Sequence, residues 1–376
     1  CKQNYTYPVG FPYEHWSKEE ADVLLSEVAT HLNPKIEAKI NIEKYAKRAE
    51  KIGVEILSID QAHVGTDKSS ALINGLIDKL KALHVKVALH TEVKAIEKEK
   101  KVLILEDGTK IGFHHLILAP GRADYDWLQE QMDTLGVSYS DNIVDIGVRI
   151  ETKEENYPIV RDYYDPKILF PGKIRTFCTN SGCAHIVREK YKGYYSVNGH
   201  SLSRENERNN LVNFAMLKTI RLTEPVVSGQ QFGKILGEMV MQLSGGSVIM
   251  QRVGDFRMGA RSKAETFNND LYDFEPTLKN AVAGDLSLCM PAKILRDIWK
   301  SLKMLDTIIP GVLHPSTIIY YPEIKTYSNK PVFIDEHFCV KEGYYIIGDG
   351  AGTSRGITAA WASGIRAALG ILKEKV

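Results

Sequence analysis

The sequence predicts an α/β protein whose α/β part is interrupted along the chain by an α+β segment. Near the C-terminus, the apolar run Tyr344–Ile347 precedes a glycine-rich turn and an Ala-rich helix that reaches Leu372, the strand–turn–helix order of α/β folds. Short apolar runs on either side of the turn signal Asp107-Gly108 predict a β-meander. Between these two regions, residues 146–335 mix strand and helix patterns, which indicates a separate α+β unit.

Composition limits the classes of protein that the chain can represent. Its 376 residues suffice for two domains, and 44% apolar with 25% charged residues is ordinary for a globular enzyme. A net charge of +1 creates no field that favours nucleic acid or an anionic membrane. Five cysteines are few and odd in number, which favours a reducing compartment. Since no signal peptide or bilayer-long apolar run is found, we expect a cytoplasmic protein whose partner is a small-molecule substrate.

The first part of the chain is predicted to be mainly helical. Ser17-Lys-Glu-Glu20 is a capping box that predicts a helix to Leu32. A second helix is expected from Asn41 to Gly53, and a third from Ser69 to His84 with its leucines on one face. The alternating run Val54–Ile59 between them predicts a strand.

The predicted strands and helices of the centre follow from the same patterns. The meander and the strand after it are expected at 85–89, 92–97, 102–105, 110–112 and 114–118. The last of these runs into Ala119-Pro-Gly-Arg122. Further strands are expected at 144–151, 174–178, 184–188 and 194–198, and helices at 228–243 and 291–306.

The glycine-rich turn near the C-terminus has the form of an anion-binding site. Gly348, Gly350 and Gly352 allow a close backbone approach, and Thr353 or Ser354 can cap the following helix. The free N–H groups and the helix dipole then point in the same direction.

A dinucleotide fingerprint is excluded for this turn, although Gly350, Gly352 and Gly356 have a similar spacing. That fingerprint needs a second strand with an acidic ribose ligand about twenty residues on, whereas the sequence ends at Val376. The acid lies inside the turn instead, as Asp349, where a carboxylate suits the hydroxyls of a polyol chain.

At these residues the sequence resembles a known family. Gly348-Asp-Gly-Ala-Gly352 is similar to the second flavin motif of FAD-dependent oxidoreductases of the glutathione-reductase type. Ala119-Pro-Gly121 resembles the family's Ala-x-Gly connection between meander and flavin sheet. Phrases of the centre, such as Arg175-Thr-Phe-Cys-Thr and Val197-Asn-Gly-His-Ser, resemble the uncharacterised bacterial FAD-dependent dehydrogenases. This resemblance runs from about residue 40 to residue 376.

The resemblance implies a fold and a division into domains. The fold is an FAD/NAD(P)-binding, Rossmann-like three-layer domain with a β-meander, plus an inserted α+β substrate domain. Residues 1–53 would be a helical N-terminal segment, residues 54–145 and 336–376 a discontinuous FAD-binding domain, and residues 146–335 the inserted domain.

The resemblance also implies a cofactor and its ligands. FAD is expected, with NAD(P)H docking transiently if it serves as electron donor, because no separate nicotinamide unit is found. Asp349 would hold the ribityl chain or pyrophosphate, and the helix start would face the pyrimidine edge of the flavin. The residues carried over are Val93, Ala119, Gly121, Gly348, Asp349, Gly350, Gly352, Thr353, Gly356 and Ile357.

The sequence departs from the family at its start. The related sequences begin with a βαβ unit carrying Gly-x-Gly-x-x-Gly, which is absent here, and residue 1 is Cys rather than Met. We therefore expect the chain to be a piece of a longer protein. Two functions remain: an FAD-dependent oxidoreductase, or a non-catalytic nucleotide-binding or interaction module with an incomplete cofactor site.

Three residues are candidates for the chemistry. His200, beside Asn198 and Ser201, is a proton donor near neutral pH or part of a hydrogen-bonded loop. Cys178 is a lone thiol near the flavin, or one half of a redox or metal pair with Cys183. Lys325 alternates on a strand with Glu323 and Tyr327, and either Lys325 or Tyr327 is placed near substrate by the resemblance.

Two other clusters contain side chains that bind ligands in other proteins. Arg252, Asp255, Arg257 and Arg261 form a basic patch that binds a substrate carboxylate or makes a structural network. The pair His114-His115 has no third residue at metal-ligand spacing, so no metal site is predicted.

Overall fold

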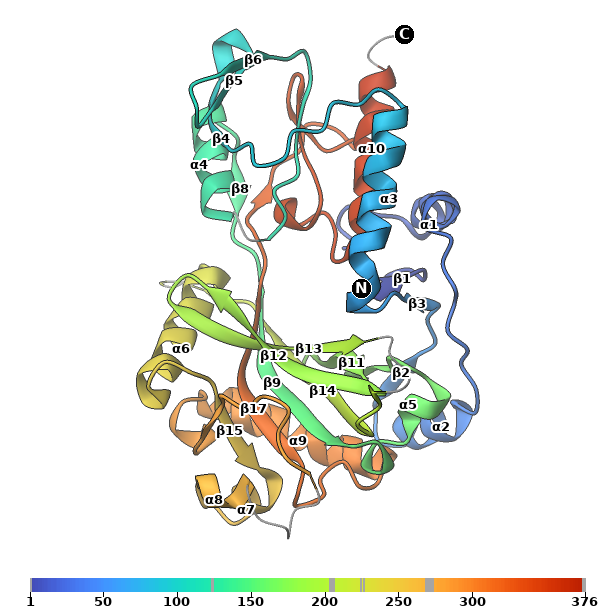
Figure 1. The fold of residues 1–376 in the computed structure, drawn as a ribbon, viewed down its shortest axis with the longest axis vertical. Coiled ribbons are helices and arrows are strands. Elements are labelled where there is room, and N and C mark those ends of the chain that lie inside the picture. Colours follow the sequence, from blue (N-terminus) through green and yellow to red (C-terminus); the bar gives the residue numbers. More distant parts are fainter. Residues whose placement is uncertain are drawn as a thin grey trace.

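The chain forms an elongated molecule with an upper and a lower part. The computed structural model describes residues 2–122, 125–202, 207–223, 225, 227–267 and 274–373. The lower part is built on a large sheet, and the upper part contains the C-terminal helix and several small sheets (Figure 1). The fold is therefore a mixed α/β fold with one dominant sheet.

The helices are α1 (Lys18–Leu32), α2 (Glu43–Glu50), α3 (Ser69–Ala82), α4 (Tyr125–Leu135), α5 (Ile159–Asp162), α6 (Gly229–Ser244), α7 (Val253–Arg257), α8 (Ala264–Phe267), α9 (Ala292–Ile308) and α10 (Ile357–Lys373). The strands up to the first long one are β1 (Lys2–Asn4), β2 (Glu55–Leu57), β3 (Gln61–His63), β4 (Val93–Glu97), β5 (Val102–Leu105), β6 (Lys110–Gly112), β7 (Leu116–Leu118), β8 (Tyr139–Ser140) and β9 (Val144–Lys153). The others are β10 (Lys167–Phe170), β11 (Ile174–Asn180), β12 (Cys183–Tyr191), β13 (Tyr194–Leu202), β14 (Leu211–Ile220), β15 (Ile249–Arg252), β16 (Val282–Ala283), β17 (Ile318–Thr326), β18 (Lys330–Pro331), β19 (Cys339–Lys341) and β20 (Tyr344–Ile346).

The lower part is organised by an eight-stranded sheet in the order β16-β15-β17-β9-β14-β11-β10-β2. Its pairs are antiparallel except β15 with β16. The central strand β9 is buried on both faces, and its residues alternate between apolar and polar. Ile146, Val148 and Ile150 belong to the main apolar core. Asp145 and Arg149 are in the alternate positions and point to the opposite face, because successive side chains of a strand do so.

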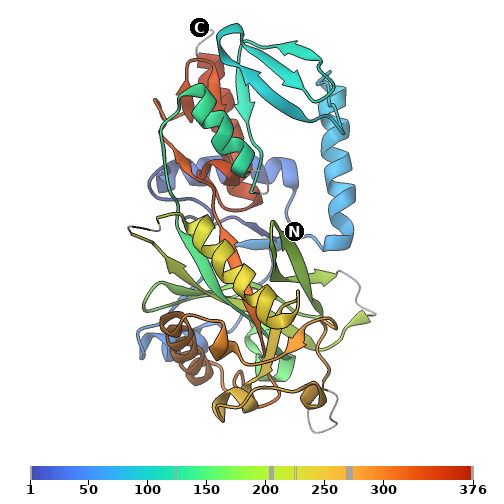
Figure 2. The same ribbon diagram turned by 90° about the vertical axis from the view of Figure 1, so that its left-hand side faces the viewer.

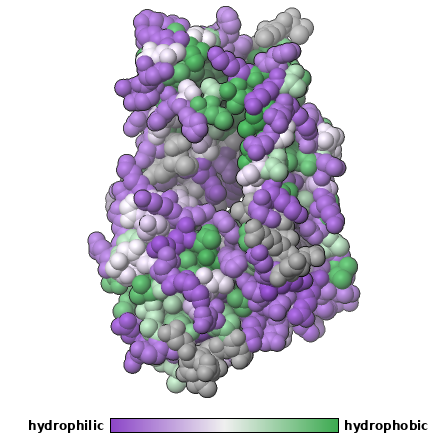
Figure 3. Space-filling view, in the orientation of Figure 1, coloured by the Kyte–Doolittle hydropathy of each residue, from purple (hydrophilic) through white to green (hydrophobic). Residues whose placement is uncertain are grey.

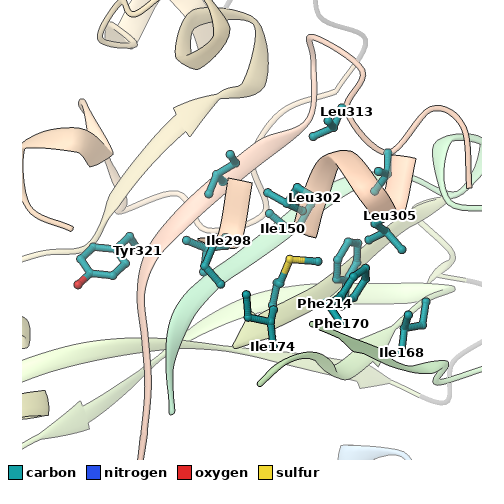
Figure 4. Packing of buried hydrophobic residues seen from close by; sticks show 14 of the residues in the cluster. Ile150, Ile168, Phe170, Ile174, Phe214, Ile298, Leu302, Leu305, Leu313 and Tyr321 are labelled. Atoms are coloured by element: carbon teal, nitrogen blue, oxygen red, sulfur yellow. The ribbon is translucent and has the colours of Figure 1, made fainter. Parts of the chain in front are cut away.

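The apolar face of this sheet packs against α9 (Figure 4). The helix contributes Ile298, Leu302 and Leu305, all almost fully buried. They meet Ile174 and Phe214 from neighbouring strands. Each buried aliphatic or aromatic side chain contributes about 1.5–3 kcal/mol, so this layer is a major source of the stability of the lower part. The polar face is thereby left to form a site.

The upper part contains a three-stranded sheet in the order β19-β20-β7. Tyr345 of β20 packs with α1 and α10 on one face. Its neighbours Tyr344 and Ile346 pack with α4 and Leu118 on the other. The three-stranded meander β4-β5-β6 adjoins this second face through Ile96. Both faces of the small sheet are therefore covered, and β7 is an edge strand within the described residues.

Helix α3 has no buried residue. It overlaps α10 in the view of Figure 1, but Figure 2 shows the two helices well apart. Its side chains Ile73 and Leu80 are 54% and 42% exposed. The described chain covers the predicted amphipathic face only in part, since Leu72 packs against the cluster of α1 and α10.

Most of the predicted elements are found, with two corrections. The cap of α1 is confirmed, since the Ser17 hydroxyl accepts from the Glu20 N–H. Residues 85–89, predicted as a strand, are not one. The strand β2, at the start of the range 54–145 assigned to the flavin domain, pairs with β10 of the large sheet, and α2 packs there too through Tyr45.

The leucines of α3 lie on a face that is only partly covered, because Leu72 packs against the cluster of α1 and α10 whereas Leu80 is 42% exposed. The second correction concerns a helix cap. Neither Thr353 nor Ser354 caps α10, which begins at Ile357. Among the residues that the structure describes, no helix is both long and apolar enough to cross a membrane.

Candidate functional site

The two motifs at the ends of the upper sheet meet in space. Strands β7 and β20 are parallel, with Leu118 opposite Ile346, so the turns that follow them lie side by side. A Cβ on Gly350 would come within 2.5 Å of the Gly121 carbonyl oxygen. Glycine is required at Gly350 because of this contact, and its own φ is not in the left-handed range. Although nearly 230 residues separate the two motifs in the sequence, the motifs are in contact in the fold.

Asp349 holds the turn between β20 and α10 together. Its carboxylate accepts hydrogen bonds from the Gly356 N–H (3.0 Å) and the Ser354 hydroxyl (2.8 Å). The Thr353 hydroxyl donates to the Gly348 carbonyl. Arg122 Nε lies 3.9 Å from the Asp349 carboxylate. The carboxylate remains 21% exposed, so it keeps a face toward the space below it.

That space is a cavity of about 690 Å³ between the upper and lower parts, a size that suits a small ligand. The space-filling view shows the surface hollowed at this level (Figure 3). Asp349 and Gly356 line the cavity from above. Cys178, His200 and Lys325 line it from the polar face of the large sheet and the hairpin β12–β13 that covers part of it.

An ion-pair network with a fully buried centre, Arg149 and Glu323, lies under the floor of the cavity. Arg149 forms a two-point pair with Glu323, at 2.7 and 2.9 Å. Lys325 Nζ lies 3.6 Å from Glu323 and 3.3 Å from Glu189. Gly199 of the hairpin is pressed onto this network, because a Cβ there would lie 2.2 Å from Arg149 Nη1. The network fixes the hairpin on the sheet and the Lys325 ammonium at the cavity wall.

Cys178 lies in an irregularity of β11. The register of β11 against β14 shifts between Phe177 and Asn180, and Cys178 has a left-handed φ of 48°. Non-glycine residues rarely adopt this conformation, and those that do cluster at functional sites. The Cys178 carbonyl accepts hydrogen bonds from Arg149 and Asn180, which hold the distorted backbone in place.

The electrostatics around Cys178 favour its thiolate. Burial raises the pKa of the Cys178 thiol, but the positive charges of Lys2 and Arg149 outweigh it, so the pKa is lowered from its ordinary value. A thiol with a lowered pKa that lines a cavity is more nucleophilic near neutral pH than a structural cysteine. Cys183, by contrast, is buried with its Sγ 3.5 Å from His185 Nε2, and it lies outside the cavity lining.

Two histidines of the cavity are neutral at neutral pH. Partial burial lowers the pKa of His200, so its ring is mainly the neutral imidazole, which has one donor and one acceptor nitrogen. Burial, followed by the charge of Lys2, lowers the pKa of His63 to about 4. The His63 Nδ1 lies 3.2 Å from the Tyr164 hydroxyl, which fixes the orientation of the ring.

Two buried carboxylates stand beside the lower wall. Asp165 is 2.6 Å from Lys167 Nζ and 3.3 Å from Lys2 Nζ. Asp145 is 2.6 Å from Arg175 Nη2 and accepts from the Tyr327 hydroxyl. Neither carboxylate is among the candidate residues predicted from the sequence. For Asp145 an indication was present, because Asp145, Arg149 and Glu151 alternate with apolar residues in β9, which signals a polar face in a buried sheet.

The predicted site residues divide into two groups. Five line the cavity together, namely Asp349, Gly356, Cys178, His200 and Lys325. Tyr327, also singled out from the sequence, lines it too. The others lie outside the lining: Val93, Ala119, Gly121, Gly348, Gly350, Gly352, Thr353 and Ile357. Of these, Gly121 contacts Gly350 directly, whereas Val93 is in the meander, in β4.

The basic patch around Arg252 does not line the cavity. Arg252 is fully buried, with its guanidinium over the rings of Phe267 and Phe274. It donates to the carbonyl oxygen of Ser316. Arg257 and Arg261 are exposed. For Arg252 the structure therefore supports the structural alternative, and a carboxylate site at this patch stays a prediction.

Comparisons with known proteins give distant similarities. No protein-family model matches the sequence. An uncharacterised protein of Clostridium beijerinckii is 24% identical over 351 residues. These residues are 85% of this chain but 63% of that protein, so the chain spans less than two thirds of this relative. The structure of 2,6-dihydroxypyridine-3-hydroxylase from Arthrobacter nicotinovorans matches with a TM-score of 0.36 and 12% identity, over 96% of this chain and 73% of that one. Neither similarity is high enough to assign an activity.

Proposed function

We propose that the chain belongs to an FAD-dependent oxidoreductase that transfers hydride or electrons between a small molecule and the flavin. The observation that carries this proposal is the composition of the cavity. It joins the turn with Asp349 and Gly356 to Cys178, His200 and Lys325 on the other wall. A cavity that unites a candidate cofactor turn with titratable side chains from another part of the chain is the usual form of a cofactor enzyme.

The residues of the turn fit a flavin nucleotide. Gly350 and Gly121 lie in close contact, and because neither has a side chain, a ligand can approach the backbone of both turns. The first turn of α10, from Ile357, has N–H groups without intrahelical partners, which suit a negatively charged group. The partly exposed carboxylate of Asp349 suits a hydroxyl of the ribityl chain. When bound, FAD would supply the hydride or electron chemistry.

Each predicted ligand has a proposed place along the cofactor. Asp349 and the turn residues would hold the ribityl chain, the pyrophosphate and the flavin edge, namely Gly348, Gly350, Gly352, Thr353, Gly356 and Ile357. Gly121 and Ala119 would serve the other end, with the backbone of Val93 at the adenine. NAD(P)H, if it is the donor, would dock transiently over the flavin.

The chain's own side chains would prepare the substrate. Neutral His200 can accept a proton from a substrate hydroxyl or amine. Lys325 is held in place by Glu189 and Glu323, so its ammonium can orient a polar substrate group at low conformational cost.

Two uncovered surfaces support the proposal that an additional βαβ unit completes the flavin domain. Helix α3 buries none of its residues, and β7 is an edge strand within the described residues. An upstream βαβ unit would cover an apolar helix face and add strands to a parallel pair. The greater length of the Clostridium relative is consistent with such a unit.

The test is the visible absorption spectrum of the purified protein, alone and with an upstream segment restored. The proposal expects flavin absorption bands that dithionite bleaches, in the longer form at least. Absence of flavin from both forms after incubation with FAD would overturn the proposal. The non-catalytic nucleotide-binding module would then be favoured if an unreactive nucleotide binds instead.

A pair of variants tests the completion of the flavin domain separately. Ile73→Lys in α3 should leave the stability of this chain unchanged, because the side chain is 54% exposed, yet lower the flavin content of the longer form. Lys68→Ala, just before the same helix, is the matched control that should change neither. Equal flavin content in all three longer proteins would show that α3 does not contact the upstream unit.

A further inference from the structure

The lower wall of the cavity carries more positive than negative charge. Lys167 and Arg175 project from neighbouring strands β10 and β11 into the cavity, and Lys2 and Arg355 reach it from β1 and from the turn before α10. The buried carboxylates beside them are Asp165 and Asp145, described above.

Each of these carboxylates faces two cations. The Asp165 carboxylate is 1% exposed and lies within ion-pair distance of both Lys167 and Lys2. One carboxylate neutralises one ammonium, so among the described residues one positive charge stays uncompensated. This charge is next to the cavity, since both lysine side chains line it.

The same imbalance occurs at Asp145. Its carboxylate pairs with Arg175 and accepts from Tyr327. The Arg355 guanidinium lies 4.5 Å from the centre of the Tyr327 ring. Within the described part of the chain, Arg355 has no carboxylate at ion-pair distance. A second positive charge is therefore uncompensated, on the other side of the wall.

The remaining lower-wall cations are neutralised. Arg149 is paired with Glu323, and Lys325 with Glu189. The excess is therefore restricted to the two places just described. Between them lies the ring of Phe177, with Lys167 Nζ 5.6 Å and the Arg175 guanidinium 4.9 Å from its centre. Leu169 and Leu57 extend this apolar surface.

We propose that the cavity binds a small organic acid, with its carboxylate at Lys167 and Lys2 or at Arg175 and Arg355 and its apolar body over Phe177. A carboxylate there would supply the missing negative charge, and charge-assisted hydrogen bonds to buried cations are strong. The two places suit a monocarboxylate or a dicarboxylate. That this acid is the substrate rests on the proposed oxidoreductase function, whereas the preference of the cavity for anions does not.

Cys178 provides a reporter of this charge inside the cavity. The experiment compares the rates at which iodoacetate and iodoacetamide alkylate Cys178 in the chain without flavin, with peptide mapping to identify the site. Both reagents react with the same thiolate, so the ratio of rates cancels the thiolate fraction. The ratio reports how much the cavity favours a carboxylate over the neutral amide.

The expected ratio is roughly tenfold higher than for glutathione in the same buffer, equivalent to about 1.4 kcal/mol of added attraction. It should fall with added salt, because ions screen the attraction. Lys167→Met and Arg175→Met should each lower it. Lys303→Met, which removes an exposed charge on α9, is the matched control and should not.

A second measurement decides the case in which Cys178 is inaccessible to both reagents. The melting temperature is recorded with benzoate and succinate and with the uncharged amides benzamide and succinamide. Greater stabilisation by the acids, lost in Lys167→Met, supports the proposal. Equal effects of acids and amides, or a glutathione-like alkylation ratio, would overturn it. Inorganic phosphate and FAD are added as separate arms, and stabilisation by either one but not by the carboxylates would also overturn it.

The outcome separates the two proposals. An anion preference in a protein that never binds flavin would keep the acid site and refute the oxidoreductase. Flavin binding without an anion preference would refute the acid site and leave the oxidoreductase standing.

Discussion

The guanidinium of Arg149 and the carboxylate of Glu323 form a two-point ion pair in which neither side chain has any exposed surface. The pair joins the central strands β9 and β17 and also reaches the hairpin through the hydrogen bond from Arg149 to Asn198. It therefore connects the stability of the lower part with the shape of the cavity.

Removing one partner of this pair should be costly. Arg149→Met leaves the Glu323 carboxylate buried without its main partner, and we expect a loss of about 3–5 kcal/mol in the free energy of unfolding. Urea denaturation measures it. Lys18→Met, which breaks the exposed pair with Asp22, is the control and should have almost no effect. A comparable loss in both variants would refute the buried-pair argument.

The contact between the turns at Gly121 and Gly350 predicts that two glycines respond in opposite ways to substitution by alanine. Gly350→Ala should destabilise the protein by about 1–3 kcal/mol, because its Cβ would collide with the Gly121 backbone and neither turn can yield freely. Gly75→Ala, in the exposed helix α3 with no atom near its added Cβ, should stabilise by about 0.5–1 kcal/mol. Thermal or urea unfolding of both variants checks the pair. A neutral Gly350→Ala would mean that the motifs do not touch.

Asp165 predicts how stability depends on pH. Burial raises the pKa of its carboxyl, but attraction to Lys167 and Lys2 outweighs burial and holds the pKa well below its ordinary value. A carboxyl with a lowered folded-state pKa stabilises the protein above the unfolded pKa of about 3.9. That contribution is lost as the pH falls further, toward the folded-state pKa. Urea unfolding across this acidic range should show the loss.

The variant Asp165→Asn isolates this contribution. It should be less stable than the parent protein near neutral pH, because the two lysines lose their shared counter-ion. Its stability should fall less steeply below about pH 4, since the titrating carboxyl is gone. Parallel pH profiles for the two proteins would exclude Asp165 as a source of the acid sensitivity.

The cysteines should differ sharply in reactivity. The pKa of Cys178 is lowered by its cationic neighbours despite its burial, whereas burial raises the pKa of Cys289 to about 12. Iodoacetamide should therefore label Cys178 at a lower pH than an ordinary thiol and leave Cys289 unmodified in the folded protein. Mass spectrometry of the alkylated peptides gives both profiles. Lys2→Met should move the Cys178 profile to higher pH, and an unmoved profile would contradict the assigned cause.

The sequence by itself determined the local elements and the two glycine motifs. Local patterns predict features that depend on neighbours within a few residues. Examples are the cap at Ser17, the alternation in β9 and the glycines around Asp349. His200, Cys178 and Lys325 were selected as candidates because of their chemistry, and all three line one cavity. Their use in catalysis and the domain boundaries stay predictions.

Only the tertiary structure decided which charges face one another. The pairs Arg149–Glu323 and Asp165–Lys2 join residues more than 160 positions apart, and no periodicity records such contacts. The protonation of His200 and Cys178 depends on burial and on cations from other strands, which are set only when the sheet closes. For the same reason Arg252, which belongs to a basic patch in the sequence, is a buried side chain between two aromatic rings in the fold.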